Sequence, residues 1–187
     1  MIKIAITGSI ASGKTTASKI LSRGRGPLFS ADDTIKKFYN NNVFQRLLAK
    51  KFDIKKTGLK RSLKKKIFEN KNNIKQLEKI IHPKVRKKMK KFTTLHRKKD
   101  KLFYEIPLLI ENNLMHYFDI IIFIKAKKKL RLKRFKAKGG DSKLFSILNN
   151  KQYSDKKKAK FSDHIIVNEK NLNILKKNLL GIIKLYV

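Results

Sequence analysis

The residues with the clearest chemical meaning lie in one stretch near the start of the chain, GSIASGKT, where Gly8 is followed after four residues by Gly13, Lys14 and Thr15. Glycines let a backbone curl so that successive N–H groups point at phosphate oxygens. The lysine supplies charge for the β- and γ-phosphates, and the threonine hydroxyl binds Mg²⁺. An apolar, strand-like run precedes the motif and a helical pattern follows it, which is the context that a phosphate loop requires. The stretch therefore predicts binding of a nucleoside triphosphate.

This loop occurs in GTPases, motor ATPases and small-molecule kinases, so other residues must separate these classes. The stretch NEKN (168–171) lacks the last residue of the guanine-reading pattern Asn-Lys-x-Asp, which argues against a GTPase. Glu105 lies near the end of LFYEI, where it either orients magnesium or meets solvent. Small size, a long helical stretch and a later basic helix favour a kinase that phosphorylates a nucleotide or another metabolite.

The net charge of the chain is strongly positive, because 49 lysines and arginines stand against 13 acidic residues to give +36. Such a charge favours a polyanionic partner such as nucleic acid. The lysines are nevertheless spread over the chain after residue 48, and only eight of the basic residues are arginine. This bias, with abundant Asn, Ile and Phe, is typical of an AT-rich genome. We therefore do not expect nucleic acid as the primary partner, and a basic nucleic-acid-binding module is the less favoured alternative.

Length and composition restrict the class of protein further. A chain of 187 residues with 41% hydrophobic residues suits one domain with its own core. The chain has no cysteine, so disulfides and thiolate metal sites are excluded. Its first stretch turns polar after six residues, unlike a signal peptide, and no apolar run approaches the length of a membrane span. We expect a soluble cytoplasmic protein without a membrane partner, and the oligomeric state stays open.

Short apolar runs alternate with helical patterns along the chain. Strands are expected over 2–7, 27–31, 102–106, 119–125 and 164–168. Helices are expected over 14–22, 127–138, 142–150 and 170–184, and residues 32–99 have an almost purely helical pattern, with Phe38, Leu47, Leu48 and Phe52 on one apolar face. The alternation predicts an α/β fold: a P-loop NTPase-like parallel five-stranded sheet with helices on both faces, a helical insertion and a lid.

Six motifs follow one another along the chain. They are the phosphate loop; Ser30-Ala31-Asp32; GLKRSLKKKIFEN (58–70), with Gly58, Arg61, Leu63 and Phe68; LEKIIHPKV (77–85); IPLLIE (106–111); and a last group of Arg134, Gln152 and SDHIIVN (162–168). Together, in this order and at compatible spacings, they resemble the dephospho-CoA kinase family, and the likeness covers essentially the whole chain.

The resemblance implies transfer of the ATP γ-phosphate to the ribose 3′-hydroxyl of dephospho-CoA, the last step of coenzyme A synthesis, with Mg²⁺ as cofactor. Residues 1–187 would form a single kinase domain. Within it, residues 32–99 would be the helical insertion that binds the acceptor, and residues 126–155 would be the lid that closes over ATP. The alternative is a kinase of another nucleoside or nucleotide, which would share the loop but have a different acceptor pocket.

The resemblance also assigns catalytic roles. Asp32 is expected to face the acceptor hydroxyl and accept its proton, although Asp32 also suits a helix cap. Lys14 and Arg134 are expected to stabilise charge on the transferring phosphoryl group, with Arg131 as a rival for the second role. Asp33 matches no catalytic position, and we assign it to the start of a helix.

Nucleotide and acceptor contacts complete the predicted site. The acceptor residues are Asp32, Arg61, His82 and Glu111, although His82 equally suits a structural cap at the start of a helix. Asn168 is expected near the adenine, with a turn-forming role as the alternative. The nucleotide contacts are Gly8, Ala11, Ser12, Gly13, Lys14, Thr15, Thr16 and Asn168, and Thr15 is the metal ligand.

Some positions depart from the family pattern. Ser9 and Ala11 stand in a loop that usually has more glycine, so a positive φ at either would strain the backbone. Ser30 replaces the first aspartate of Asp-Ala-Asp, which removes one carboxylate that could orient a metal. Lys138 stands where the family often has a second lid arginine. These departures bear on rate and on how the chain holds magnesium.

Overall fold

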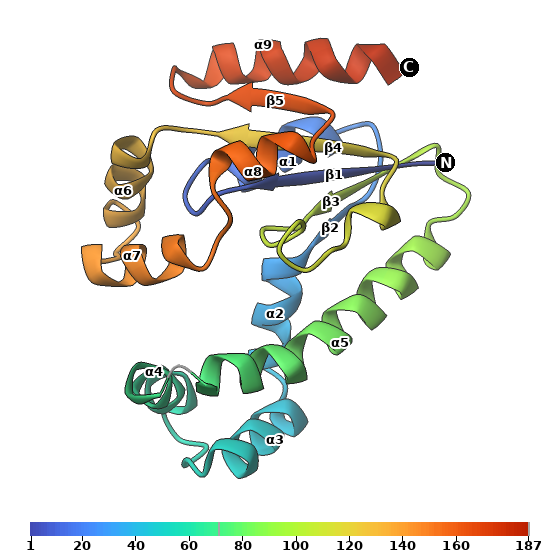
Figure 1. Ribbon diagram of the computed structural model, residues 1–187. Helices are drawn as coiled ribbons and strands as arrows, with labels where there is room; N and C mark the ends of the chain where they lie inside the picture. The colour runs from blue at the N-terminus through green and yellow to red at the C-terminus, as the bar shows by residue number, and fades with distance from the viewer. Residues whose placement is uncertain (71, 187) are drawn as a thin grey trace. The chain divides into compact units, whose positions relative to one another are not determined.

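The computed structural model describes residues 1–70 and 72–186, without the side chain of Phe68, and divides into two compact units (Figure 1). One unit consists of residues Met1–Ser30 and His96–Val187 and contains the sheet. The other unit consists of residues Ala31–Leu95 and is helical. Each unit is described by itself.

The sheet has five parallel strands in the order β2-β3-β1-β4-β5, as the alternation of strands and helices predicts. Because β1 lies in the centre, its apolar residues are covered on both faces and form a nearly continuous buried run. In register, Ile6 pairs with Glu105 of β3, and Gly8 pairs with Ile124 of β4. The strands are β1 Ile2–Gly8, β2 Leu28–Ser30, β3 Lys101–Glu105, β4 Ile120–Lys125 and β5 His164–Val167.

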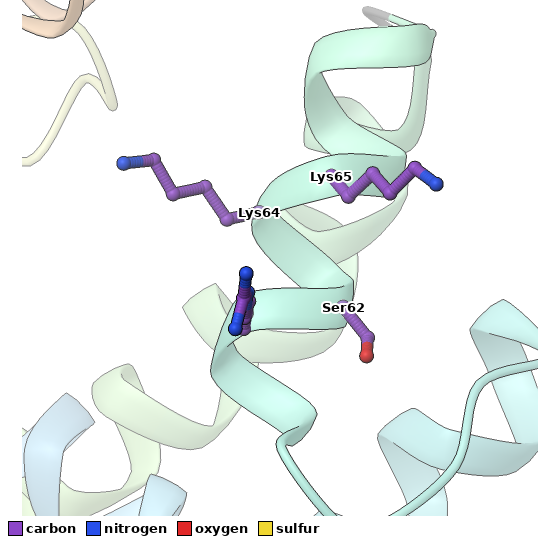
Figure 2. Close-up of a pocket in the computed structure, with 4 residues that line it drawn as sticks. Ser62, Lys64 and Lys65 are labelled. Carbon is purple, nitrogen blue, oxygen red and sulfur yellow. The ribbon is translucent and has the colours of Figure 1, made fainter.

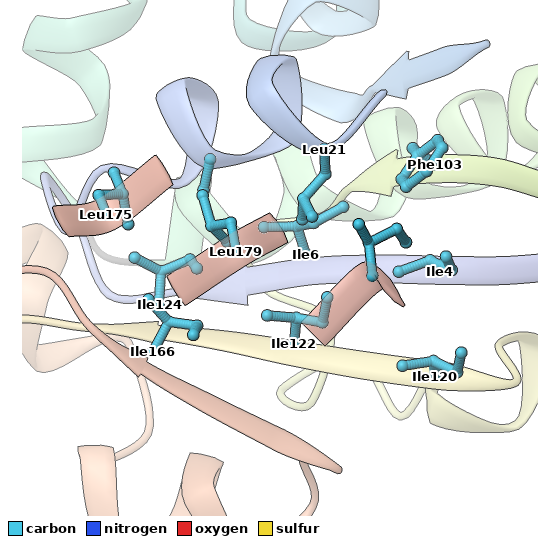
Figure 3. Packing of buried hydrophobic residues seen from close by; sticks show 12 residues of the cluster. Ile4, Ile6, Leu21, Phe103, Ile120, Ile122, Ile124, Ile166, Leu175 and Leu179 are labelled. Atoms are coloured by element: carbon cyan, nitrogen blue, oxygen red, sulfur yellow. The ribbon is translucent and has the colours of Figure 1, made fainter. Parts of the chain in front are cut away.

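One face of the sheet is covered by α1 and α9, and their contact forms the main core (Figure 3). Leu21 of α1 and Leu179 of α9 are fully buried against Ile6 and Ile122. Burying a side chain of this size stabilises the fold by about 1.5–3 kcal/mol. This packing fixes the direction of α1, whose first residue is the loop lysine Lys14, relative to the ends of the strands.

Helix boundaries in this unit mostly follow the apolar pattern. Helix α7 has the predicted bounds, while α6 and α9 are shorter at both ends than predicted. Helix α8 was not predicted; it begins after Ser154, whose side chain accepts a hydrogen bond from the N–H of Lys157. The helices are α1 Lys14–Ser22, α6 Lys128–Lys136, α7 Ser142–Asn150, α8 Asp155–Lys160 and α9 Leu172–Ile183, with 3₁₀ turns η1 Met115–Tyr117 and η2 Lys184–Tyr186.

The second unit consists of α2 Ala31–Tyr39, α3 Asn42–Phe52, α4 Leu59–Glu69 and α5 Asn72–Leu95. Its core contains Phe44, Leu48 and Phe52 of α3 packed against α4 and α5. Leu47, predicted for the apolar face, is 43% exposed, and Phe44 is buried instead. Residues 44, 48 and 52 are spaced by four and form one row along the helix, and Leu47 lies at the edge of that row.

No helix within residues 1–70 and 72–186 combines the length and the apolar character needed to cross a membrane.

Candidate active site

The phosphate loop joins the carboxyl end of β1 to the start of α1, and two of its positions have no room for a side chain. A Cβ on Gly8 would lie 2.5 Å from the carbonyl oxygen of Ile124. A Cβ on Gly13 would lie 2.2 Å from Nδ2 of Asn168, and Gly13 has a φ of 102°. Packing and backbone conformation therefore require glycine at these positions. Glycine also lets a phosphate approach the backbone of the loop closely.

Lys14 is the first residue of α1, and only 8% of the residue is exposed. Its Nζ donates a hydrogen bond to the carbonyl oxygen of Ser9 at 3.2 Å. The ammonium group is thus held across the mouth of the loop, close to the first turn of α1. The N–H groups of that turn and the lysine together form a positive region suited to phosphate oxygens.

Ala11 has a φ of 57°, so the left-handed conformation falls on a residue with a Cβ. This is the strain that the missing glycine predicts, because an L-residue in this region costs about 1–2 kcal/mol. Ser9, the other replaced glycine, is not among the described residues with positive φ. The departure from the family pattern therefore strains one of the two positions.

We expect Ala11→Gly to raise the free energy of unfolding by about 1 kcal/mol, because glycine adopts this φ without strain. Urea unfolding followed by circular dichroism measures the change. Ala49→Gly, within helix α3, is the matched control and should lower the free energy of unfolding by about 1 kcal/mol. A loss of stability in Ala11→Gly would contradict the assignment of strain to this residue.

Thr15 and Glu105 meet at the carboxyl ends of the central strands. The Thr15 hydroxyl donates a hydrogen bond to Oε1 of Glu105 at 2.5 Å, and Glu105 is only 2% exposed. Of the two interpretations of Glu105, the one in which it meets solvent is therefore wrong. A hydroxyl and a carboxylate are the hard oxygen donors that Mg²⁺ prefers, and Mg²⁺ is usually held by one or two carboxylates, waters and substrate phosphates.

Glu105 is the functional candidate that the predicted set of site residues omitted. Its signal in the sequence was an acid at the end of an apolar strand in a chain with only 13 acids. Ser30, which stands in place of the family's first aspartate, pairs with Glu105 in the register of β2 and β3. The carboxylate of Glu105 therefore lies on the neighbouring strand, beside the position at which Ser30 lacks one. Within the described residues, no cluster of three or more His, Cys, Asp or Glu could hold a metal.

Asn168 follows β5 and braces the loop from the side of the last strand. Its Nδ2 donates to the carbonyl oxygen of Ser12 at 2.8 Å, and the residue is 7% exposed. Arg134 lies beside it and donates through Nη1 to the carbonyl oxygen of Asn168 at 3.0 Å. The structure thus brings together Ser12, Asn168 and Arg134, three residues that are far apart in the sequence.

Arg131, the rival of Arg134, is 5% exposed and is held by protein groups. Its Nε donates to the carbonyl oxygen of Ala126. Its Nη1 donates to the carbonyl oxygen of Ile10 and to Oδ1 of Asn149. Burial lowers the pKa of Arg131, and the nearby Asp155 acts in the opposite direction. Because Arg131 is buried and its Nε and Nη1 are occupied within the fold, it suits a structural role, and Arg134 stays the candidate for contact with phosphate.

Glu111 follows β3 and is paired with Lys158 of α8. Lys158 Nζ lies 2.8 Å from Glu111 Oε1, and the two side chains are 0% and 10% exposed. The same oxygen accepts a hydrogen bond from the backbone N–H of Tyr153 at 2.8 Å. Oε2 of Glu111 is buried without a hydrogen-bond partner in the described part of the chain. Oε1 of Glu111 is thus bonded within the fold, while the buried Oε2 can still accept a hydrogen bond.

The remaining candidates belong to the helical unit. Asp32 and Asp33 lie in the first turn of α2, where acids interact favourably with the helix dipole, and both are exposed. Asp33 forms an ion pair with Lys36 at 2.8 Å. This pairing suits the structural role predicted for Asp33. Asp32 is separated by only one residue, Ala31, from Ser30, the last residue of β2.

His82 lies in the interior of α5, directly before Pro83, which is also inside the helix. The alternative in which His82 caps a helix start is therefore wrong. Burial lowers the pKa of His82 below its ordinary value; Glu78 acts in the opposite direction, and Arg86 adds to the lowering. His82 is consequently neutral at pH 7 and able both to donate and to accept a hydrogen bond.

Arg61 lies on α4 beside an open hollow of about 560 Å³ (Figure 2). Among the described residues, Arg61, Ser62, Lys64 and Lys65 line it. Figure 2 shows Lys64 and Lys65 extending from different sides of α4. The cationic side chains on this part of α4 favour an anionic ligand, and arginine offers a planar fork that matches phosphate.

Comparison with known proteins agrees with this geometry. The shikimate kinase from Acinetobacter baumannii has the same fold, with a TM-score of 0.54 at 14% sequence identity, covering 100% of this chain and 93% of that one. A parallel sheet with a glycine loop, its lysine and its threonine at the carboxyl end of the central strand defines a nucleotide-binding protein with the P-loop fold.

More specific matches identify the family. The model of the dephospho-CoA kinase family matches residues 2–173, and the chain belongs to that family. The dephospho-CoA kinase of Bartonella henselae is 32% identical over 187 residues, which cover 97% of this chain and 96% of the relative. The dephospho-CoA kinase from Campylobacter jejuni is similar in structure, with a TM-score of 0.68 at 26% identity, covering 97% of this chain and 95% of that one.

Proposed function

We propose that this protein transfers the γ-phosphoryl group of ATP to the ribose 3′-hydroxyl of dephospho-CoA and so produces coenzyme A. The family match over residues 2–173 carries the choice of acceptor. The buried Lys14 and the pair of Thr15 and Glu105 support the choice of phosphoryl transfer. Since the family acts in coenzyme A synthesis, we also propose the cytoplasm as its place of action.

In this proposal, the loop from Gly8 to Thr16 binds the phosphates of ATP. Its N–H groups contact the phosphate oxygens, and Lys14 exchanges its bond to the Ser9 carbonyl for the β- and γ-phosphates. Thr15 and Glu105 are the residues that would hold Mg²⁺. When bound, the ion neutralises charge on the β- and γ-phosphate oxygens. Asn168 keeps the second half of the loop in place through the Ser12 carbonyl.

Asp32 is the proposed general base. A carboxylate at this position orients the acceptor hydroxyl and accepts its proton as the bond to phosphorus forms. Arg134 supplies a positive charge for the transferring phosphoryl group, as an arginine provided by the same chain. Residues 126–155 act as the lid that excludes water, which would otherwise compete with the acceptor hydroxyl.

Recognition of the acceptor is assigned to residues 32–99 together with Glu111. Arg61 binds a phosphate of dephospho-CoA, in keeping with the cationic hollow on α4. His82, neutral at pH 7, contacts a polar group of the acceptor as donor or acceptor. Oε2 of Glu111 accepts a hydrogen bond from the substrate.

The acceptor is tested by measuring ADP release from purified protein with ATP, Mg²⁺ and either dephospho-CoA or a panel of nucleosides and nucleoside monophosphates. We expect ADP release with dephospho-CoA and none above background with the panel. Turnover of a nucleoside monophosphate without turnover of dephospho-CoA would replace this proposal with the alternative, a kinase of another nucleotide.

The magnesium assignment predicts that Glu105→Gln raises the Mg²⁺ concentration needed for half-maximal activity by about 10- to 100-fold, the range for residues that orient a metal site. The physical reason is the loss of the negative charge beside Thr15. Initial rates measured over a Mg²⁺ series at saturating ATP give this value. Glu69→Gln, at an exposed position on α4, is the control with an unchanged requirement. An unchanged requirement in Glu105→Gln would remove Glu105 from the site.

A further inference from the structure

Residues 152–158 contact two parts of the site that are far apart in the sequence, the phosphate loop and the segment after β3. Oε1 of Gln152 accepts a hydrogen bond from the N–H of Ile10 at 2.7 Å. Oδ1 of Asp155 accepts one from the hydroxyl of Ser9 at 2.7 Å. Lys158 binds Glu111, as described above. Three residues spaced by three thus each make a side-chain contact outside their own segment; we call residues 152–158 the strap.

The contact between Ser9 and Asp155 exists because Ser9 has a hydroxyl. Ser9 is 3% exposed, so in the folded protein its hydroxyl donates to the carboxylate of Asp155 in place of water. Hydrogen bonds to an ionised acceptor are stronger than neutral ones, especially where water is excluded. A glycine at this position could not make this bond, so the residue that departs from the family pattern gains a tether that holds the first half of the loop.

Lys158 anchors the other end of the strap. Its side chain is fully buried, and its Nζ contacts Oε1 of Glu111 at 2.8 Å and the carbonyl oxygen of Pro107 at 3.4 Å. The same carbonyl accepts a hydrogen bond from the Thr7 hydroxyl at 3.3 Å, directly before the loop. A buried ammonium is tolerated only when it is paired and hydrogen-bonded, so these partners fix the position of Lys158.

We propose that Asp155 and Lys158 are positioning residues, through which the strap holds the phosphate loop in the conformation that binds ATP. Asp155 and Lys158 lie three apart on α8 and therefore on one side of the helix. Lys158 fixes α8 to the segment after β3, and Asp155 fixes Ser9 to α8. The loop, which contains a strained Ala11, is thereby kept from relaxing away from its binding conformation. This inference rests on the proposed binding of ATP by the loop.

A double-mutant cycle tests the tether. The variants are Ser9→Ala, Asp155→Ala and the double variant, and the readout is the Kd of a non-hydrolysable ATP analogue with Mg²⁺, measured by calorimetry. Each single variant is expected to weaken binding by about tenfold, the effect of losing one hydrogen bond to a charged group. The double variant should be no weaker than the singles, because all three lack the same contact. Binding within twofold of the parent, or losses that multiply, would overturn the inference.

The anchor is tested with Lys158→Met against Lys156→Met, a neighbouring position on α8 whose side chain is exposed. We expect about tenfold weaker binding of the analogue in Lys158→Met and unchanged binding in Lys156→Met. A lower melting temperature with parental affinity would show that Lys158 only supports the fold, which would overturn its role. If Lys158→Met does not fold, Lys158→Arg, which keeps the charge but cannot reproduce the contact geometry, is measured in the same way.

These results are distinguishable from failure of the proposed function. If the parent protein does not bind the ATP analogue, the proposed function itself is wrong. If the parent binds it and the strap variants bind equally well, only the positioning role of the strap is wrong.

Discussion

Replacing Asp32 with asparagine is expected to lower kcat by about 10²- to 10⁴-fold, the contribution typical of a general base. The amide keeps the size of the side chain and can still accept a hydrogen bond, but it cannot take up the proton of the acceptor hydroxyl. The Kd for ATP should stay nearly unchanged, because Asp32 is assigned to the acceptor and not to the phosphate loop. Steady-state kinetics and calorimetry with an ATP analogue measure the two quantities separately.

The next residue provides the matched control for this experiment. Asp33 is exposed in the same turn of α2 and forms its ion pair with Lys36 on the surface. An exposed pair of this kind stabilises by about 0–1 kcal/mol, so Asp33→Asn should fold and retain its kcat. If both variants kept the parental kcat, or if both lost it equally, Asp32 would not be the base.

The second large effect is expected for Lys14→Ala, which should lower kcat by about 10²- to 10³-fold and also weaken ATP binding. Lys14 is nearly buried at the start of α1, and its ammonium is the charge that the loop presents to the β- and γ-phosphates. Because its contact with the phosphates is made in the ground state and strengthens as charge develops in the transition state, binding and turnover should both fall. This pattern differs from that of Asp32→Asn, where only turnover falls.

Lys19→Ala is the control for Lys14→Ala, because Lys19 lies on the same helix with an exposed side chain. Removing it changes the net charge by the same amount without touching the loop. In a chain with a net charge of +36, this control separates a local effect from a general one. Parental ATP binding in Lys14→Ala would contradict the role assigned to the loop lysine.

The sheet and the phosphate loop could be predicted because their signals are local. Strands buried on both faces are continuous apolar runs, and the loop has fixed spacing between a strand and a helix. Even the strain at Ala11 follows from a missing glycine, once the loop is recognised. Each of these features depends on residues that are neighbours in the sequence, so the fold class was confirmed and no strand end differs from its predicted position by more than one residue.

The contacts around the loop could not be predicted, because they join residues that are far apart in the sequence. Lys158 looks like one more solvated lysine in a run of them, yet it is the fully buried partner of Glu111. Asp155 and Gln152 likewise give no local signal of their contacts with Ser9 and Ile10. Only the packing of α8 against the sheet selects these side chains from many of the same type.

Glu105 and Leu47 show two intermediate cases. Glu105 had a local signal, the end of an apolar strand, but its burial and its bond to Thr15 depend on the order of the strands. Leu47 and Phe44 both suit an apolar helix face, and packing against α4 and α5 buries Phe44. Periodicity therefore predicts that a face exists, while its edges are decided by tertiary contacts.

The most direct test of the proposed function is the identity of the product formed from ATP and dephospho-CoA. Mass spectrometry and ³¹P spectroscopy of the reaction mixture with Mg²⁺ identify the phosphorylated species. The proposal predicts coenzyme A, with a new phosphomonoester at the ribose 3′-position and one ADP for each product molecule. Formation of ADP without coenzyme A, or unchanged dephospho-CoA in the presence of bound ATP, would contradict it.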